Sequence, residues 1–168
     1  SNKVNEQKLT YLKGQNESTV TKLKGANKQL EAQVKEVDGK LTAAKTGLTN
    51  AEAQKEALAS KINEAKTAYE TRNAQLTQLT AGHNAGVLTA EQEVQYSTLT
   101  TVVPLLENQS NALVGTDKAL DGTIESLKGT VQLLTQTKES LNTSIEANKG
   151  LIQLIEGNNK VVESSIGT

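Results

Sequence analysis

The residues that could carry chemistry are few and stand apart along the chain. Cysteine is absent and His83 is the one histidine, so the set of histidine and cysteine ligands typical of a zinc site cannot be assembled. No nucleophile is paired with a base, and the carboxylates are spread along segments expected to be helical, where they are normally solvated or paired along the helix. The sequence therefore predicts a protein that is not an enzyme, with no catalytic, cofactor or metal site and no small-molecule substrate.

The amino-acid composition further narrows the class of protein to which this chain can belong. The 168 residues carry a net charge of -1 with both signs interspersed, so there is no basic stripe of the kind that binds nucleic acid. No apolar run approaches the roughly 20 residues that span a bilayer. Phe, Trp, Met and Cys are absent, which argues for a thin, elongated helical object rather than a globular core. Ser1 and Asn2 resemble the remnant of a cleaved tag, so we expect a fragment of a larger protein.

Two heptad ladders organise the chain. Apolar residues recur at alternating spacings of three and four, which indicates the buried seam of a coiled coil. The first ladder comprises Val20, Leu23, Asn27, Leu30, Val34, Val37, Leu41, Ala44, Leu48, Ala51, Lys55, Leu58, Ile62, Ala65, Tyr69, Arg72, Leu76 and Leu79. The second comprises Leu99, Val103, Leu106, Ser110, Leu113, Asp117, Leu120, Ile124, Leu127, Val131, Leu134, Lys138, Leu141, Ile145, Asn148, Ile152, Ile155, Asn159, Val162 and Ile166.

One strong break separates the ladders. We expect a helix over 6–80, a loop over 81–88 with Gly82 as the left-handed helix cap, and a helix over 89–165. Thr89 and Gln92 have the spacing of a capping box at the start of the second helix. Pro104 removes a backbone donor inside that helix, and because the ladder keeps its phase there we expect a kink rather than a second break.

A loop this short makes the two helices antiparallel neighbours, so the expected fold is all-α: one long antiparallel two-helix coiled-coil hairpin over residues 1–168. Layers form where two facing residue numbers sum to 175, which sets Leu48 against Leu127. The same sum places polar residues opposite or one layer apart from each other. These register pairs are Asn27 with Asn148, Asn16 with Asn159, and Lys55 with Asp117. Facing asparagines can exchange amide hydrogen bonds, and lysine and aspartate can form an ion pair across the seam.

Extra apolar residues beside the second ladder widen its stripe. They are Val102, Leu105, Ala112 and Val114 toward the loop, and Leu151, Leu154 and Val161 toward the chain ends. A two-helix seam needs only the narrow stripe, so the widening predicts that a second hairpin packs there and forms a homodimeric four-helix rod. The alternative is that these are scattered surface residues, which are common in soluble proteins.

The loop is the expected functional surface of the hairpin. Val87 and Leu88 are apolar residues at its apex, where exposed apolar groups can contact another protein. The alternative is that both residues fold back and cover the end of the seam.

Glycines recur with the heptad in the second half, as in Leu113-Val114-Gly115, Leu120-Asp121-Gly122 and Leu127-Lys128-Gly129. This Leu/Gly spacing on Thr-, Asn- and Gln-rich helices resembles the extracellular region of the YhgE/Pip phage-infection family, and the type VII secretion subunit EsaA (YueB) is similar. The resemblance implies a membrane-anchored, usually dimeric rod on the surface of a Gram-positive bacterium, serving as a phage receptor or secretion component.

Three functions remain open from the residues. The first is a structural and interaction module that projects from a bacterial membrane or secretion-associated protein. The second is a phage tail-fibre or baseplate stalk, in which the helices would form a parallel trimer. The third is a component of a helical-bundle toxin, which would need a hydrophobic membrane-inserting hairpin. The facing asparagines argue against the trimer, because a parallel trimer stacks identical residues.

Overall fold

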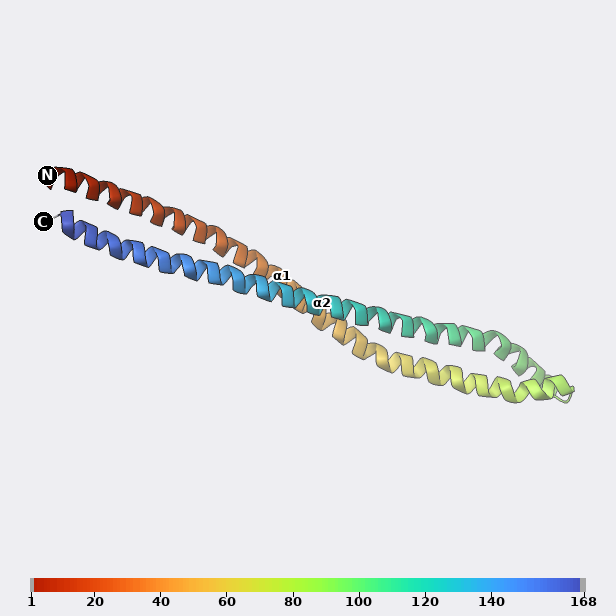
Figure 1. Ribbon diagram of the computed structural model, residues 1–168. Coiled ribbons are helices and arrows are strands. Elements are labelled where there is room, and N and C mark those ends of the chain that lie inside the picture. Colours follow the sequence, from red (N-terminus) through yellow and green to blue (C-terminus); the bar gives the residue numbers. More distant parts are fainter. Residues whose placement is uncertain (1, 167–168) are drawn as a thin grey trace. The chain divides into compact units, whose positions relative to one another are not determined.

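The computed structural model describes residues 2–166, which form two helices and the turn between them. Helix α1 spans Asn2–Ala85 and helix α2 spans Ala90–Ile166, and no strand occurs in this part of the chain. The helices run in opposite directions and pack against each other as a hairpin (Figure 1). The prediction of an all-α fold with two long antiparallel helices is confirmed.

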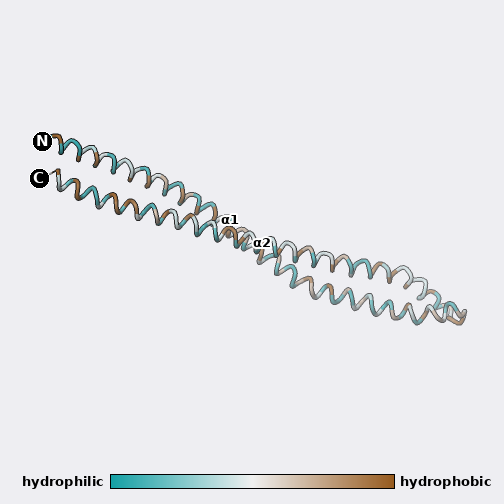
Figure 2. The backbone as a smooth tube through the Cα atoms, viewed as in Figure 1, coloured by the Kyte–Doolittle hydropathy of each residue, from teal (hydrophilic) through white to brown (hydrophobic). Residues whose placement is uncertain are grey.

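The chain separates into two compact units, each with one segment of α1 against one segment of α2. Within the described chain, unit 1 takes residues 2–44 and 130–166, and unit 2 takes residues 45–129. The most buried apolar residues of unit 1 are Val20, Leu41, Ala44, Ile145 and Val162, and those of unit 2 are Ala51, Ala65, Leu99, Val103 and Ile124. All of them are positions of the two heptad ladders, because only those positions face the other helix in a two-stranded packing. Figure 2 shows the resulting recurrence of hydrophobic residues between hydrophilic ones.

The turn between the helices comprises residues 86–89 and is shorter than the expected loop over 81–88. Helix α1 continues five residues past the predicted end, through Gly82, and the left-handed residue is Gly86 with φ of 70°. The Gly86 amide donates to the His83 carbonyl and the Val87 amide to the Gly82 carbonyl, both at 3.0 Å. These two bonds form a Schellman cap. The prediction that Gly82 is the cap was wrong. Two glycines in this segment, Gly82 and Gly86, offer alternative cap positions, and only the backbone path selects one of them.

Gly82 has a different role, which is to make room for the turn. A Cβ atom on Gly82 would lie 2.5 Å from Cδ2 of Leu88, which is closer than carbon atoms approach. On the other side of the turn, the Thr89 hydroxyl accepts a hydrogen bond from the Gln92 amide at 3.2 Å, and the Gln92 side chain accepts one from the Thr89 amide at 2.9 Å. This reciprocal pair is the capping box expected at the start of α2.

Substituting Gly86 with alanine is expected to lower the free energy of unfolding by about 1 kcal/mol, because a Cβ atom disfavours the left-handed conformation. Gly122 is the matched control: it lies within α2 with nothing within 4 Å of an added Cβ. There alanine should raise stability by about 0.5–1 kcal/mol through helix propensity. Urea unfolding of both variants measures the two shifts. Equal effects at both sites would contradict the assigned cap.

Helix α2 continues without interruption through Pro104, so no second break occurs there. Pro104 is exposed, and it has no backbone N–H to donate to the carbonyl of the preceding turn. The Thr100 hydroxyl donates to the Ser97 carbonyl at 2.6 Å in the same turns. Figure 1 shows α2 bending in its first part, in the stretch drawn green.

Candidate functional site

The polar residues of the seam in unit 1 form two similar layers. In the first, the Asn16 side-chain amide donates to Oδ1 of Asn159 at 2.7 Å, and the Asn159 amide donates to the Lys13 carbonyl at 3.3 Å. Asn159 is 8% exposed. A buried amide without partners would cost free energy, and here each side chain is bonded. The layer therefore holds the two helices of unit 1 in one register.

The second layer repeats this arrangement with Asn27 and Asn148. The Asn148 amide donates to Oδ1 of Asn27 at 2.9 Å, and the Asn27 amide donates to the Ile145 carbonyl at 3.3 Å. Asn27 is 7% exposed. The two asparagines therefore meet as the register of 175 requires, but they do not exchange hydrogen bonds: one amide donates to the other, which donates in turn to a backbone carbonyl.

A charged layer lies in the seam of unit 2. The Lys55 ammonium binds Asp117 at 3.0 Å and also Asp121 at 2.7 Å, a second partner that the sequence reasoning did not find. The hydrogen bonds to Asp121 and Asp117 raise the pKa of Lys55 above its ordinary value of 10.5. Asp121 follows Asp117 by one helical turn, so the lysine side chain reaches both carboxylates.

Ion pairs across the seam of unit 1 were also missed by the sequence reasoning. They join Lys138 to Asp38 at 2.7 Å, Lys13 to Glu163 at 3.3 Å and Lys24 to Glu156 at 3.5 Å. The register already indicated these pairs, because their residue numbers sum to between 176 and 180 and so lie within about one and a half turns of facing positions. The side chains of all three pairs are partly exposed to solvent, so each pair contributes little to stability, about 0–1 kcal/mol.

The turn in unit 2 places its two apolar residues differently. Val87 is 73% exposed, whereas Leu88 is half-buried and approaches the backbone of Gly82. Leu88 therefore folds back over the helix end, and Val87 alone stands out at the apex. Beside them, Nδ1 of His83 lies 2.7 Å from the Glu93 carboxylate, and the His83 ring stacks on Tyr96 with centroids 4.1 Å apart. This cluster joins the end of α1 to the start of α2.

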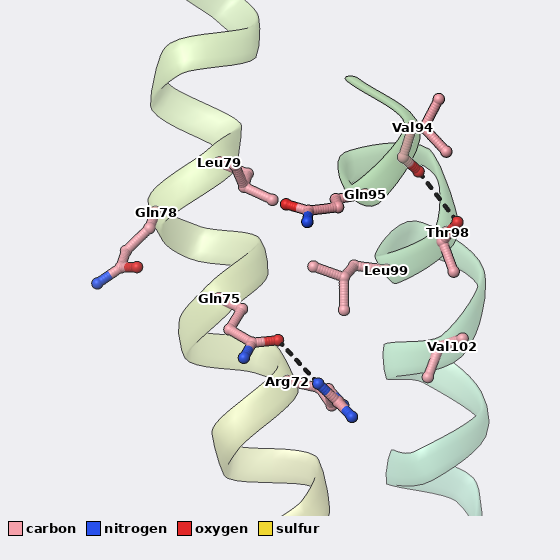
Figure 3. A pocket seen from close by; sticks show the side chains of 9 residues that line it. All are labelled: Arg72, Gln75, Gln78, Leu79, Val94, Gln95, Thr98, Leu99 and Val102. Atoms are coloured by element: carbon pink, nitrogen blue, oxygen red, sulfur yellow. Dashed lines mark hydrogen bonds between the residues drawn. The ribbon is translucent and has the colours of Figure 1, made fainter. Parts of the chain in front are cut away.

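A half-open groove of about 610 Å³ lies between the two helices of unit 2, near the turn. Its lining residues are Arg72, Gln75, Gln78, Leu79, Val94, Gln95, Thr98, Leu99 and Val102. Figure 3 shows Leu79, Gln95 and Leu99 projecting into the space between the helices and Gln78 pointing away. Arg72 is a ladder position, yet it is exposed and donates to Gln75 at 3.2 Å, because a guanidinium keeps its hydration rather than entering an apolar seam.

The described residues contain no group of three or more His, Asp or Glu side chains positioned to hold a metal ion. Neither α1 nor α2, over the part described, has an apolar stretch sufficient to cross a bilayer. What the residues do form is a register-fixed seam in each unit and, in unit 2, a capped turn with one exposed apolar side chain.

Comparison with known proteins shows the fold but no family. No protein-family model matches the chain, and no curated protein matches it. The fold is similar to that in the solved structure of the periplasmic adaptor protein EmrA, with a TM-score of 0.66 and 15% sequence identity over 96% of this chain. The match covers 51% of the EmrA chain, so the present chain spans about half the length of that protein.

Proposed function

We propose that this chain is a non-enzymatic structural and interaction module of a membrane- or secretion-associated protein, and that its turn contacts a partner protein. The observation that carries the proposal is the turn itself. Residues 86–89 are held by a Schellman cap on one side and a capping box on the other, while Val87 remains 73% exposed. A rigid, exposed apolar residue can contact a partner at little cost in conformational entropy.

The fold neighbour supports a role in assembly rather than in chemistry. EmrA is described as a periplasmic adaptor protein, and its structure is similar to this hairpin along nearly the whole present chain. An adaptor brings other proteins together, which requires a stable scaffold and an exposed contact residue. Both are features of the hairpin described above.

We place the parent protein on the surface of a Gram-positive bacterium, in the YhgE/Pip and EsaA (YueB) group, as a homodimer of hairpins. The heptad-spaced glycines of α2 support this placement: Gly115, Gly122 and Gly129 have nothing within 4 Å of an added Cβ, so their recurrence has no packing role within one chain. The location named for EmrA, the periplasm, is the alternative setting.

The two other functions have weaker support. A phage tail-fibre or baseplate stalk would bring Asn16 against Asn16 in a parallel trimer, whereas here Asn16 bonds Asn159 of the same chain. A helical-bundle toxin component would insert a hydrophobic hairpin into a membrane, and the turn between α1 and α2 carries only Val87 and Leu88 as large apolar residues.

The contact residue is tested by placing a photo-activated crosslinking amino acid at Val87 in cells that produce the parent protein. A discrete adduct with one protein is expected from Val87, and none from the matched position Thr67, which is exposed on α1 in the same unit. The identified partner should then bind purified chain at least about tenfold more weakly when Val87 is replaced by aspartate. Adducts of equal yield from both positions would overturn the proposal.

The hairpin itself is tested separately with Asn27→Cys and Asn148→Cys in one chain, which otherwise contains no cysteine. Oxidation should give an intramolecular disulfide, with loss of two hydrogen atoms, in a product that has the mass of a single chain. Products joined only between chains would favour the parallel stalk instead.

A further inference from the structure

From Leu99 to Ile166, the charged residues of α2 are confined to one side of the helix. We label the heptad positions of α2 with the letters a to g, so that the ladder residues occupy a and d. Val103 is then an a position and Leu106 a d position. From Leu99 to its end the charged residues are Glu107, Asp117, Lys118, Asp121, Glu125, Lys128, Lys138, Glu139, Glu146, Lys149, Glu156, Lys160 and Glu163. Every one of them lies at a, b or e. Positions c, f and g, which adjoin one another on a helix of 3.6 residues per turn, carry no charge.

In unit 1 these uncharged positions form a surface that we call the neutral face. It comprises Thr130, Leu133, Gln136, Thr137, Ser140, Thr143, Ser144, Ala147, Gly150, Leu151, Leu154, Gly157, Asn158, Val161, Ser164 and Ser165. Its large apolar side chains are open to solvent: Leu133 is 65% exposed, Leu154 73% and Val161 64%. The flank of α1 that adjoins position g adds Leu12, which is 42% exposed.

The opposite flank of unit 1 shows what the charges are used for. Positions e and a of α2 supply the ion pairs to α1, such as Glu156 with Lys24 and Lys138 with Asp38. A face that is only solvated normally carries charge, since Lys, Glu, Arg and Asp are the residues most often exposed. From Leu99 onward, charge therefore lies on the side of α2 that includes the ion pairs to α1 and is absent from the neutral face, as at the core of a protein interface.

We propose that two copies of this chain associate through the neutral face, α2 against α2, in a four-helix assembly. This inference rests on the proposed homodimer of hairpins and names the face through which the two copies associate. Position c of the neutral face recurs every seven residues, at Leu133, Ser140, Ala147, Leu154 and Val161. A surface that covers this row must therefore have the same heptad repeat. An uncharged heptad face on a second copy has that period, and a two-fold axis makes the same face serve both partners.

The area available is sufficient for a stable dimer. The 37 residues from Thr130 to Ile166 span about 55 Å at about 1.5 Å per residue. A strip of this length that is one to two helices wide, about 10–20 Å, covers about 550–1,100 Å² per partner, against the roughly 800 Å² of a typical specific interface. Unit 2 considered by itself also has uncharged c, f and g positions from Leu99 onward, and Leu105 at position c is 62% exposed.

The test compares two double variants of the full chain by sedimentation equilibrium. Leu133→Glu with Leu154→Glu places two charges on the neutral face. Gln132→Glu with Gln153→Glu adds the same charge one residue earlier, at position b, on the charged side. The wild type and the control should reach twice the 17.9 kDa chain mass, and the neutral-face variant should raise the dissociation constant by at least about 100-fold. Circular dichroism should show equal helix content, since both leucines are already mostly exposed.

A wild-type chain that remains monomeric at about 100 μM would overturn the proposal. A dimer weakened equally by both variants would overturn the assigned face but not self-association. If the leucine variant unfolds, Ala147→Cys (neutral face) is compared with Glu146→Cys (charged side) using a bis-maleimide crosslinker. A covalent dimer is expected from position 147 alone, and equal yields at both positions would contradict the proposal. Neither result depends on the contact at Val87, so the two proposals can fail separately.

Discussion

Asn27→Ala is expected to lower the free energy of unfolding by about 2–3 kcal/mol, although the residue is polar and lies in an apolar seam. The substitution removes the acceptor of the Asn148 amide and the bond from Asn27 to the Ile145 carbonyl. Asn148 is half-buried, so leaving its amide without this acceptor costs an amount toward the lower end of about 1–3 kcal/mol, and the space left at the 7% exposed position of Asn27 adds to that cost. Urea unfolding at an unchanged m-value measures the loss.

Replacing both asparagines with leucine should behave differently. The double variant Asn27→Leu with Asn148→Leu buries apolar groups on both sides and leaves no amide unpaired, so we expect stability equal to or above that of the wild type. The double variant should hold its register less firmly, because it loses one of the two asparagine layers that fix the sum of facing residue numbers at 175. Exposed Asn50 provides the control, and its replacement by alanine should change stability by no more than about 0.5 kcal/mol. A double variant as unstable as Asn27→Ala would contradict this account.

Ile124→Ala is expected to destabilise the chain by about 2–4 kcal/mol, the larger of the two effects. Ile124 is 7% exposed, and Ala51, 5% exposed, lies opposite. That position follows from two contacts that bracket it: Gly47 lies against the Leu127 side chain, and Lys55 binds Asp117 and Asp121. Removing three carbon atoms from the larger side chain leaves a cavity that an alanine partner cannot fill.

Exchanging the large and the small side chain between the two helices should restore most of the stability that Ile124→Ala loses. In Ala51→Ile with Ile124→Ala, the layer keeps its total volume, and volume-conserving exchanges within a core usually cost less than about 1.5 kcal/mol. Ala51→Ile alone overfills the layer and should cost about 1–3 kcal/mol. The cycle is measured by thermal and urea unfolding. Additive effects of the two substitutions would show that residues 51 and 124 do not face each other.

Part of the seam was predictable from particular residues. The ladder positions include four asparagines, Asn16, Asn27, Asn148 and Asn159. A buried amide costs less free energy where another polar group is close enough to pair with it. That preference is contained in the spacing alone, which is why one sum relates all four. The hydrogen-bond pattern was not contained in it, because an amide can donate to a side chain or to a carbonyl one turn away, as Asn27 does to Ile145.

The turn was less predictable. Gly82, Asn84 and Gly86 all favour a helix end, and only the path of the backbone selects Gly86, with its positive φ, as the cap. In the sequence alone, Val87 and Leu88 are two equivalent apolar residues at the apex of the turn. Their different exposure depends on the direction in which the chain leaves the cap, which brings Leu88 over Gly82 and leaves Val87 in solvent.

The sequence by itself therefore determined the two helices, their antiparallel pairing and the register of the seam, since these follow from periodicity and from the cost of burying unpaired polar groups. Only the tertiary structure decided the cap at Gly86, the second carboxylate on Lys55 and the exposure of Val87. Each of these depends on the local backbone path or on the reach of a long side chain, which a repeat of seven residues does not specify.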